Sequence, residues 1–154
     1  SGMGMLTERR VVEITDDLGR VVAPDWLQKA EKVHHQLRPQ LADDYAGQML
    51  GLFAAGASMA VLVEGDAVLG VSVWRIINNT SDGRRLFVDD LVSDEANRSR
   101  GAGQMLLNWL ETRARQRACA VLALDSGVQR NRAHRFYFRE GMHVSSFCFK
   151  KELK

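Results

Sequence analysis

The stretch LFVDDLVSDEANRSRGAGQMLLNWLETRARQ, residues 86–116, joins an apolar run to an amphipathic one through a segment with two glycines. Residues 86–92 form a short apolar run, which is typical of a buried strand. Residues 103–117 place apolar side chains at helical intervals, which predicts a helix. The apolar run 119–127 then predicts a further strand. This order predicts a β-α-β unit whose two strands run parallel with a right-handed crossover.

The rest of the chain supplies hairpins and further helices around this unit. In chain order, the sequence predicts a strand at 9–17, helices at 24–37 and 41–56, two strands within 58–76 around a Glu64-Gly65-Asp66 turn, a turn cluster at 78–85, a short helix at 131–141 and a last strand at 143–153. The resulting order is β-α-α-β-β-β-α-β-α-β. Such a mixture of hairpins and crossovers predicts an α/β (α+β) fold, with a mixed sheet and helices on both faces.

Length and composition fit one globular domain. The chain has 154 residues, of which 45% are hydrophobic and 26% charged. We expect one domain over residues 5–154, with residues 1–4 (SGMG) left over from expression. Cys119 and Cys148 have no CxxC spacing, so no metal site is expected and the thiols fit a cytoplasmic location. No apolar run approaches the ~20 residues of a membrane span, so no membrane partner is expected.

The charge is distributed unevenly along the chain. Residues 97–154 carry 12 Lys and Arg against 4 Asp and Glu, whereas residues 1–96 carry 9 against 15. A basic half suits an anionic ligand and an acidic half a cationic one, although surface charge without a ligand gives the same count. A nucleic-acid partner is not expected, because the basic half lacks interleaved exposed aromatic residues.

The segment RSRGAG, residues 98–103, has two interpretations. It is an ordinary strand-to-helix turn, or it is a cradle for a pyrophosphate at the first turn of the helix, where backbone N–H groups lack intrahelical acceptors. Gly101 and Gly103 would let a phosphate approach the backbone, and Arg98 and Arg100 would add charged donors. The dinucleotide pattern GxGxxG fails because Leu106 stands at its third glycine, and the Walker pattern fails as well.

Two blocks together resemble the GNAT N-acetyltransferase superfamily. The first is the family's R/Q-x-x-G-x-G/A loop after an apolar strand, matched by Arg98, Gly101 and Gly103. The second is NRAHRFYFREGM, whose matching residues are Asn131, Ala133, Phe136, Tyr137 and Gly141. With the order of elements, the resemblance covers nearly the whole chain. The sequence departs from the family at Ser93, where an apolar residue is common, and at Glu95, where proline is common.

The resemblance implies a fold and a cofactor site. The fold would be a mixed, mainly antiparallel sheet in which the strands at 86–92 and 119–125 splay apart, so that the pantetheine arm of acetyl-CoA lies in the gap. Backbone groups of residues 91–93 would bind that arm, residues 98–103 would hold the pyrophosphate, and Asn131 would be a side-chain partner. The expected cofactor-binding residues are Leu91, Val92, Ser93, Arg98, Ser99, Arg100, Gly101, Ala102, Gly103 and Asn131.

Acetyl transfer to an amine also needs proton transfer. By resemblance, Tyr137 is the expected acid that protonates the departing thiolate, because the family places this tyrosine near the sulfur. Asp89 or Asp90 is the expected base, since a carboxylate in an apolar strand needs solvent, a partner or a function. Successive strand residues point to opposite faces, so both can face the substrate only if the strand bulges. A salt-bridged or edge-exposed pair is the structural alternative for these two residues, as a core residue is for Tyr137.

The expected function is transfer of the acetyl group of acetyl-CoA to a primary amine by direct attack in a ternary complex. The alternative is a CoA- or acyl-CoA-binding module without catalysis, acting as a sensor or interaction domain. The acidic half and the aspartate pair favour a small cationic amine or a peptide amine as acceptor. The acceptor's identity, a preference for a longer acyl chain and the oligomeric state stay open, although family members often form homodimers.

Overall fold

The computed structural model describes residues 8–154, apart from the side chains of residues 98–100. The chain forms two compact units, one ending at Ala123 and one spanning Leu124–Lys154, and each is described by itself. The single domain over residues 5–154 therefore stays a prediction. Within the described part of the chain, no helix is both long and apolar enough to cross a membrane.

A five-stranded sheet in the order β1-β2-β3-β4-β5 frames the first unit. Its strands are β1 (Arg9–Glu13), β2 (Ser58–Glu64), β3 (Ala67–Asn79), β4 (Gly83–Ser93) and β5 (Val121–Leu124). The first four strands pair antiparallel in sequence order. The predicted hairpin turn lies between Glu64 and Ala67, where Gly65 takes a φ of 59° that favours glycine.

The link between β4 and β5 is a helical crossover. The backbone N–H of Ala120 donates to the carbonyl of Arg84 at 2.8 Å, so β5 starts beside the start of β4. If β5 ran antiparallel to β4 from this point, it would pass the first residue of β4, Gly83, and have no further residues of β4 beside it. Instead, β5 is hydrogen-bonded to β4. The two strands therefore run parallel, as the sequence predicts. With four residues, β5 is too short to reach the level of residues 91–93.

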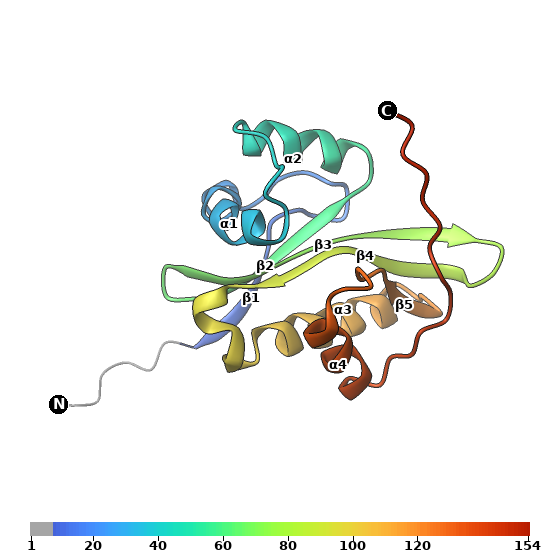
Figure 1. Cartoon of the computed structure of the whole chain (residues 1–154). Helices are drawn as coiled ribbons and strands as arrows, with labels where there is room; N and C mark the ends of the chain where they lie inside the picture. Colours follow the sequence, from blue (N-terminus) through green and yellow to red (C-terminus); the bar gives the residue numbers. More distant parts are fainter. Residues whose placement is uncertain (1–7) are drawn as a thin grey trace. The chain divides into compact units, whose positions relative to one another are not determined.

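Helices cover both faces of the sheet, as Figure 1 shows. They are α1 (Pro24–Leu37) and α2 (Tyr45–Ala54) on one face and α3 (Ala102–Gln116) on the other. One buried cluster joins α1 and α2 to Val61 and Val63, and another joins α3 to Leu62. The alternation along β2 thus assigns one face to each layer of helices. The second predicted helix begins at Tyr45 rather than Leu41, because the Asp44 side chain caps it by accepting from the Gly47 N–H at 3.1 Å.

The second unit contains α4 (Asn131–Arg139), which confirms the predicted short helix. Gly141, at φ 86°, ends the helical segment, and the Met142 N–H donates to the Tyr137 carbonyl at 3.0 Å.

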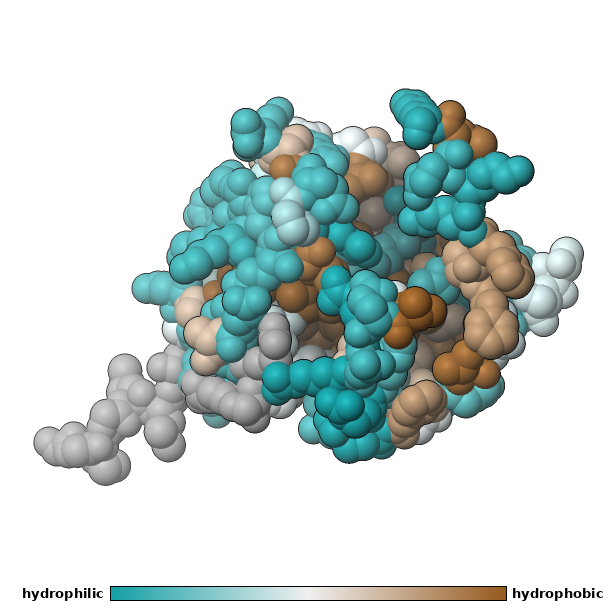
Figure 2. Space-filling model, in the orientation of Figure 1, coloured by the Kyte–Doolittle hydropathy of each residue, from teal (hydrophilic) through white to brown (hydrophobic). Residues whose placement is uncertain are grey.

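The predicted strand at 143–153 is wrong. Residues 143–154 have no regular secondary structure, and Phe147 and Phe149 are 79% and 94% exposed. Figure 2 shows brown, hydrophobic side chains on the surface along this segment. The sequence alternates Val144, Ser146 and Cys148 with residues that include both phenylalanines, so neither side is uniformly polar. Strand propensity describes a fit to neighbouring strands, and among the described residues none pairs with this segment.

Candidate active site

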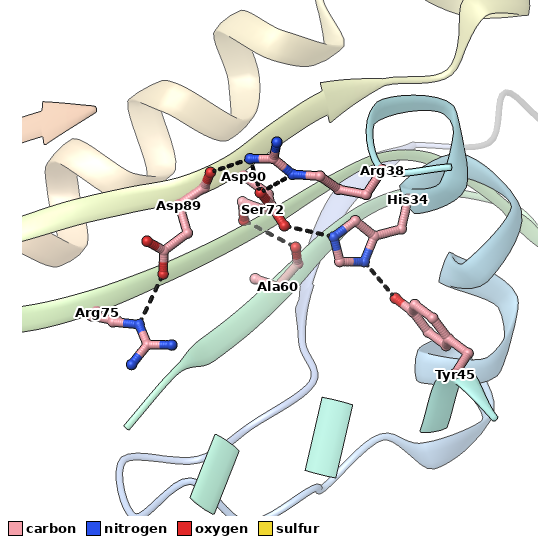
Figure 3. Close-up of polar contacts among 8 residues, drawn as sticks. All are labelled: His34, Arg38, Tyr45, Ala60, Ser72, Arg75, Asp89 and Asp90. Atoms are coloured by element: carbon pink, nitrogen blue, oxygen red, sulfur yellow. Dashed lines mark hydrogen bonds and ion pairs between the residues drawn. The ribbon is translucent and has the colours of Figure 1, made fainter. Parts of the chain in front are cut away.

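Asp89 and Asp90 lie at an irregularity in the pairing of β3 with β4. Val73 is paired with Asp90, but the next residue, Trp74, is paired with Val88, so Asp89 is an extra residue in β4. This is a β-bulge. In a regular strand, two successive side chains would point to opposite faces of the sheet. Because of the bulge, both aspartates lie on the face that α1 and α2 cover. Figure 3 shows their side chains on this side of the strand.

Both oxygens of the Asp90 carboxylate have partners at the C-terminal end of α1, where His34 lies in the last turn and Arg38 directly follows the helix. His34 Nε2 lies 2.7 Å from Oδ2, and Arg38 reaches Oδ1 with Nε at 2.8 Å and Nη2 at 2.6 Å. The Asp90 side chain is 14% exposed. Burial alone would raise its pKa, but the hydrogen bonds from His34 and Arg38 and the charge of Arg38 outweigh burial and hold the pKa below its ordinary value. A carboxylate with a lowered pKa is a weaker base, so the geometry suits Asp90 as an anchor.

His34 continues this chain of contacts into the core. Its Nδ1 lies 2.8 Å from the Tyr45 hydroxyl, and both side chains are almost fully buried. With a neutral imidazole, the Tyr45 O–H donates to Nδ1 and the Nε2–H donates to Asp90, so every polar group is satisfied. Burial, with the nearby charges of Glu31 and Asp90, raises the pKa of Tyr45, so its hydroxyl stays protonated and available as a donor.

The sequence analysis assigned no functional role to His34, Tyr45 or Arg38. A signal existed for His34, which shares the buried face of its helix with Leu27, Ala30 and Val33. A polar side chain at such a position needs a partner, but the sequence does not say that the partner lies more than fifty residues away.

Asp89 is arranged differently from its neighbour. Arg75 Nε donates to Oδ2 at 2.9 Å, and Arg38 Nη2 donates to the Asp89 backbone carbonyl at 3.1 Å. Oδ1 has no hydrogen-bond partner among the described residues, and the side chain is 34% exposed. Of the two predicted bases, Asp89 therefore presents an accessible carboxylate oxygen.

The predicted cofactor loop follows directly from the end of β4. A 3-10 helix, η1 (Glu95–Arg100), leads to Gly101, which takes a left-handed conformation at φ 76°. Helix α3 then begins at Ala102, one residue earlier than predicted, and its first intrahelical bond runs from the Met105 N–H to the Gly101 carbonyl. No heavy atom lies within 4 Å of the position that a Cβ on Gly101 would take, so this turn leaves room for a ligand group.

These features fit the pyrophosphate of acetyl-CoA. The N–H groups of Ala102 and Gly103 precede the first intrahelical bond, and the helix dipole adds partial positive charge there. The side chains of Arg98, Ser99 and Arg100 lie outside the described residues, so their contributions stay predictions.

Helix α1 is also hydrogen-bonded to the residues that lead from β4 into this loop. Gln36 donates from Nε2 to Asp94 Oδ1 at 3.0 Å and accepts the Glu95 N–H at 3.0 Å. The Gln36 hydrogen bond is the largest influence that lowers the pKa of Asp94. The end of α1 thus contacts both the aspartates on β4 and the start of the cofactor loop.

Leu91, Val92 and Ser93 are paired with β3 on one edge of β4, opposite Ser72, Val71 and Gly70. Their other edge lies beyond the reach of the four-residue β5. Backbone groups at this edge are therefore suitable for an extended ligand that pairs like a strand, which is the role predicted for them.

The remaining predicted residues lie in the second unit. Asn131 is the first residue of α4, and the half-buried Tyr137 has its ring centroid 5.3 Å from that of Phe136. Burial raises the pKa of Tyr137, which keeps the phenol protonated at neutral pH. Their roles towards acetyl-CoA and Asp89 stay predictions. Among the described residues, no group of His, Cys, Asp and Glu could hold a metal ion.

Comparison of this chain with known proteins places it among acetyltransferases. The family model described as the acetyltransferase (GNAT) family matches residues 21–142. An uncharacterized N-acetyltransferase, YhdJ of Bacillus subtilis, is 40% identical over 70 residues, which cover 45% of this chain and 49% of that protein. The aminoalkylphosphonate N-acetyltransferase of Salmonella typhimurium is 39% identical over 66 residues, 43% of each chain. The matches thus span about half the length of these curated relatives.

A solved structure extends the similarity of fold to nearly the whole chain. The aminoglycoside N-acetyltransferase AAC(6')-Iy, in complex with a bisubstrate analogue, has a TM-score of 0.79 at 12% identity. The match covers 96% of this chain and 99% of that one.

Proposed function

Because the chain belongs to the acetyltransferase (GNAT) family, we propose that it transfers the acetyl group of acetyl-CoA to a primary amine by direct attack in a ternary complex. The observation that carries the proposal is the layout of β4. One strand presents an accessible carboxylate at its bulge and then runs into the left-handed Gly101 turn at the start of α3. Groups for the amine and for the donor's phosphates therefore follow one another along a single segment.

The acceptor amine must be deprotonated before it attacks, since an ammonium has no free electron pair. In the proposed mechanism Asp89 Oδ1 binds the ammonium and accepts its proton, directly or through a water molecule. Asp90 holds the bulge in place through His34 and Arg38. The nitrogen then forms a bond to the acetyl carbon, the bond from that carbon to sulfur breaks, and the nitrogen releases its second proton to solvent.

The donor side is served by backbone groups and by Tyr137. N–H groups at the end of β4 would stabilise the negative charge that develops on the thioester oxygen. Tyr137 would give its proton to the departing sulfur and would recover a proton from solvent. Burial raises the pKa of its phenol, so the proton is present at neutral pH. Bound acetyl-CoA would supply the activated acetyl group, and the residues proposed to hold it are the N-terminal turn of α3, residues 91–93 and Asn131.

An amine acceptor is supported by the curated relatives. Both are named as N-acetyltransferases, and the name of the Salmonella protein describes an acceptor that contains an amine.

The test is release of the CoA thiol in the presence of acetyl-CoA and a panel of primary amines. We expect amine-dependent release in a one-to-one ratio with the acetylated amine. The alternative function, a CoA-binding module without catalysis, predicts binding of acetyl-CoA and no release with any amine. That result would contradict the proposal.

A further inference from the structure

We infer that the acceptor carries an anionic group, a carboxylate or a phosphonate, a few bonds from its amine, and that Arg75 and Arg38 recognise this group. The inference rests on the proposed function, because it places the amine at Asp89. It narrows the acceptor from a primary amine to a small zwitterion.

The first support is the charge of the cluster. Asp89 is paired with Arg75 at 2.9 Å, and Asp90 is paired with Arg38 at 2.6 Å. The two carboxylates and the two guanidinium groups have a formal charge of zero. A polycation would find no net negative charge here, so the cationic acceptor that the acidic half of the sequence favours is not supported locally. A zwitterion can match both signs.

The second support is the number of donors that the two arginines keep. Arg75 uses Nε for Asp89 and Nη1 for the Ala55 carbonyl at 3.3 Å, while Arg38 uses Nε and Nη2. Nη2 of Arg75 and Nη1 of Arg38 have no partner among the described residues. Their side chains are 32% and 40% exposed, so these donors can meet a ligand. A free Nη group on a guanidinium can donate a charge-assisted hydrogen bond to a carboxylate or a phosphorus oxyanion.

The third support is distance. An amine bound to Asp89 Oδ1 lies on the carboxylate whose other oxygen is 2.9 Å from Arg75 Nε. An anion two or three bonds from that nitrogen therefore comes within reach of the same guanidinium. Figure 3 shows Arg75 at the side-chain carboxylate of Asp89 and Arg38 at its backbone carbonyl, so a guanidinium group lies at each end of this residue.

Four amines of similar length test the inference on the wild-type protein: propylamine, beta-alanine, aminoethylphosphonate and diaminopropane. We expect kcat/KM for thiol release to be ~10- to 100-fold higher for the two anionic amines than for propylamine, as charge-assisted hydrogen bonds allow. Diaminopropane should be the poorest acceptor. Equal rates with diaminopropane and beta-alanine would overturn the inference and leave the proposed function standing.

Calorimetric titration of the same amines into the CoA-loaded protein separates the two proposals. Selective binding of the anionic amines without turnover would overturn the proposed function alone. If none of the four amines binds or reacts, the inference is overturned for this class of acceptor.

Two variants connect the preference to Arg75. Arg75→Gln should reduce the ratio of kcat/KM for beta-alanine over propylamine by about tenfold or more, and Arg75→Lys, which keeps the charge, should reduce it less. Arg20→Gln is the matched control, because it removes another arginine–aspartate pair, with Asp16, on an exposed loop. An unchanged ratio in folded Arg75→Gln would contradict the inference.

Discussion

The two neighbouring carboxylates of β4 differ in their partners, and so they should differ in what their loss does. Asp89 has an accessible oxygen, and we expect Asp89→Asn to lower kcat by ~10²–10⁴-fold, the usual contribution of a general base. Asparagine can still accept from Arg75, so the affinity for acetyl-CoA should stay within twofold. Steady-state thiol release and calorimetric titration measure the two effects. Wild-type kcat in this variant would exclude Asp89 as the base.

Asp90 should instead affect stability, with a defined dependence on pH. Its pKa in the folded protein lies below the ordinary value of 3.8, so the folded state binds this proton more weakly than the unfolded state does. The stabilisation is complete above pH 3.8 and is lost as the pH falls through the lower folded pKa. The free energy of unfolding of Asp90→Asn, measured in urea between pH 7 and 3, should therefore fall less steeply than that of the wild type. Parallel curves would show that Asp90 makes no such contribution.

His34 is expected to act on the reaction through Asp90. His34→Leu leaves Asp90 Oδ2 and the Tyr45 hydroxyl without their hydrogen-bond partner, and we expect it to cost about 1–3 kcal/mol of stability and to lower kcat. His34→Gln keeps an N–H group for Asp90 and should restore part of kcat. If His34 has a purely structural role, kcat per folded molecule should be the same in both variants. Rates divided by the folded fraction of each variant check this.

At the scale of elements, the packing of α3 on β3 is tight at Gly70. A Cβ on Gly70 would lie 2.7 Å from Leu106 Cδ1 and 3.2 Å from the Val92 carbonyl, so Gly70→Ala should destabilise the protein by about 1–3 kcal/mol. Gly51 in α2 has no atom within 4 Å of the same position, and Gly51→Ala should stabilise by about 0.5–1 kcal/mol. Urea unfolding of both variants checks the opposite signs. A stabilising Gly70→Ala would contradict the packing of α3 on this strand.

Most elements could be predicted because their signals are local. Periodicity identified α1, α3 and α4, and Gly65 identified the β2–β3 turn. The strand at 143–153 could not be judged this way, since a strand exists only where another pairs with it. The bulge at Asp89 depends on how β4 pairs with β3, which the sequence does not show. The sequence analysis could say only that both aspartates face the substrate if the strand bulges. The His34 network joins residues 34, 45 and 90, a relation that no local pattern contains.

At the scale of the whole molecule, the central claim is that the Gly101 turn holds the phosphates of acetyl-CoA. Gly101→Glu places a carboxylate where the pyrophosphate would lie, so like charges would repel. Gly83→Glu is the matched control, because Gly83 also has a positive φ, 72°, and no atom within 4 Å of its Cβ position, but it is the first residue of β4, directly after the β3–β4 turn.

Calorimetric titration of acetyl-CoA into the wild type, Gly83→Glu and Gly101→Glu tests this claim most directly. We expect one molecule of acetyl-CoA per chain for the wild type and for Gly83→Glu, and no detectable binding for folded Gly101→Glu. Binding by Gly101→Glu with the Kd of the wild type would contradict the assignment of this turn.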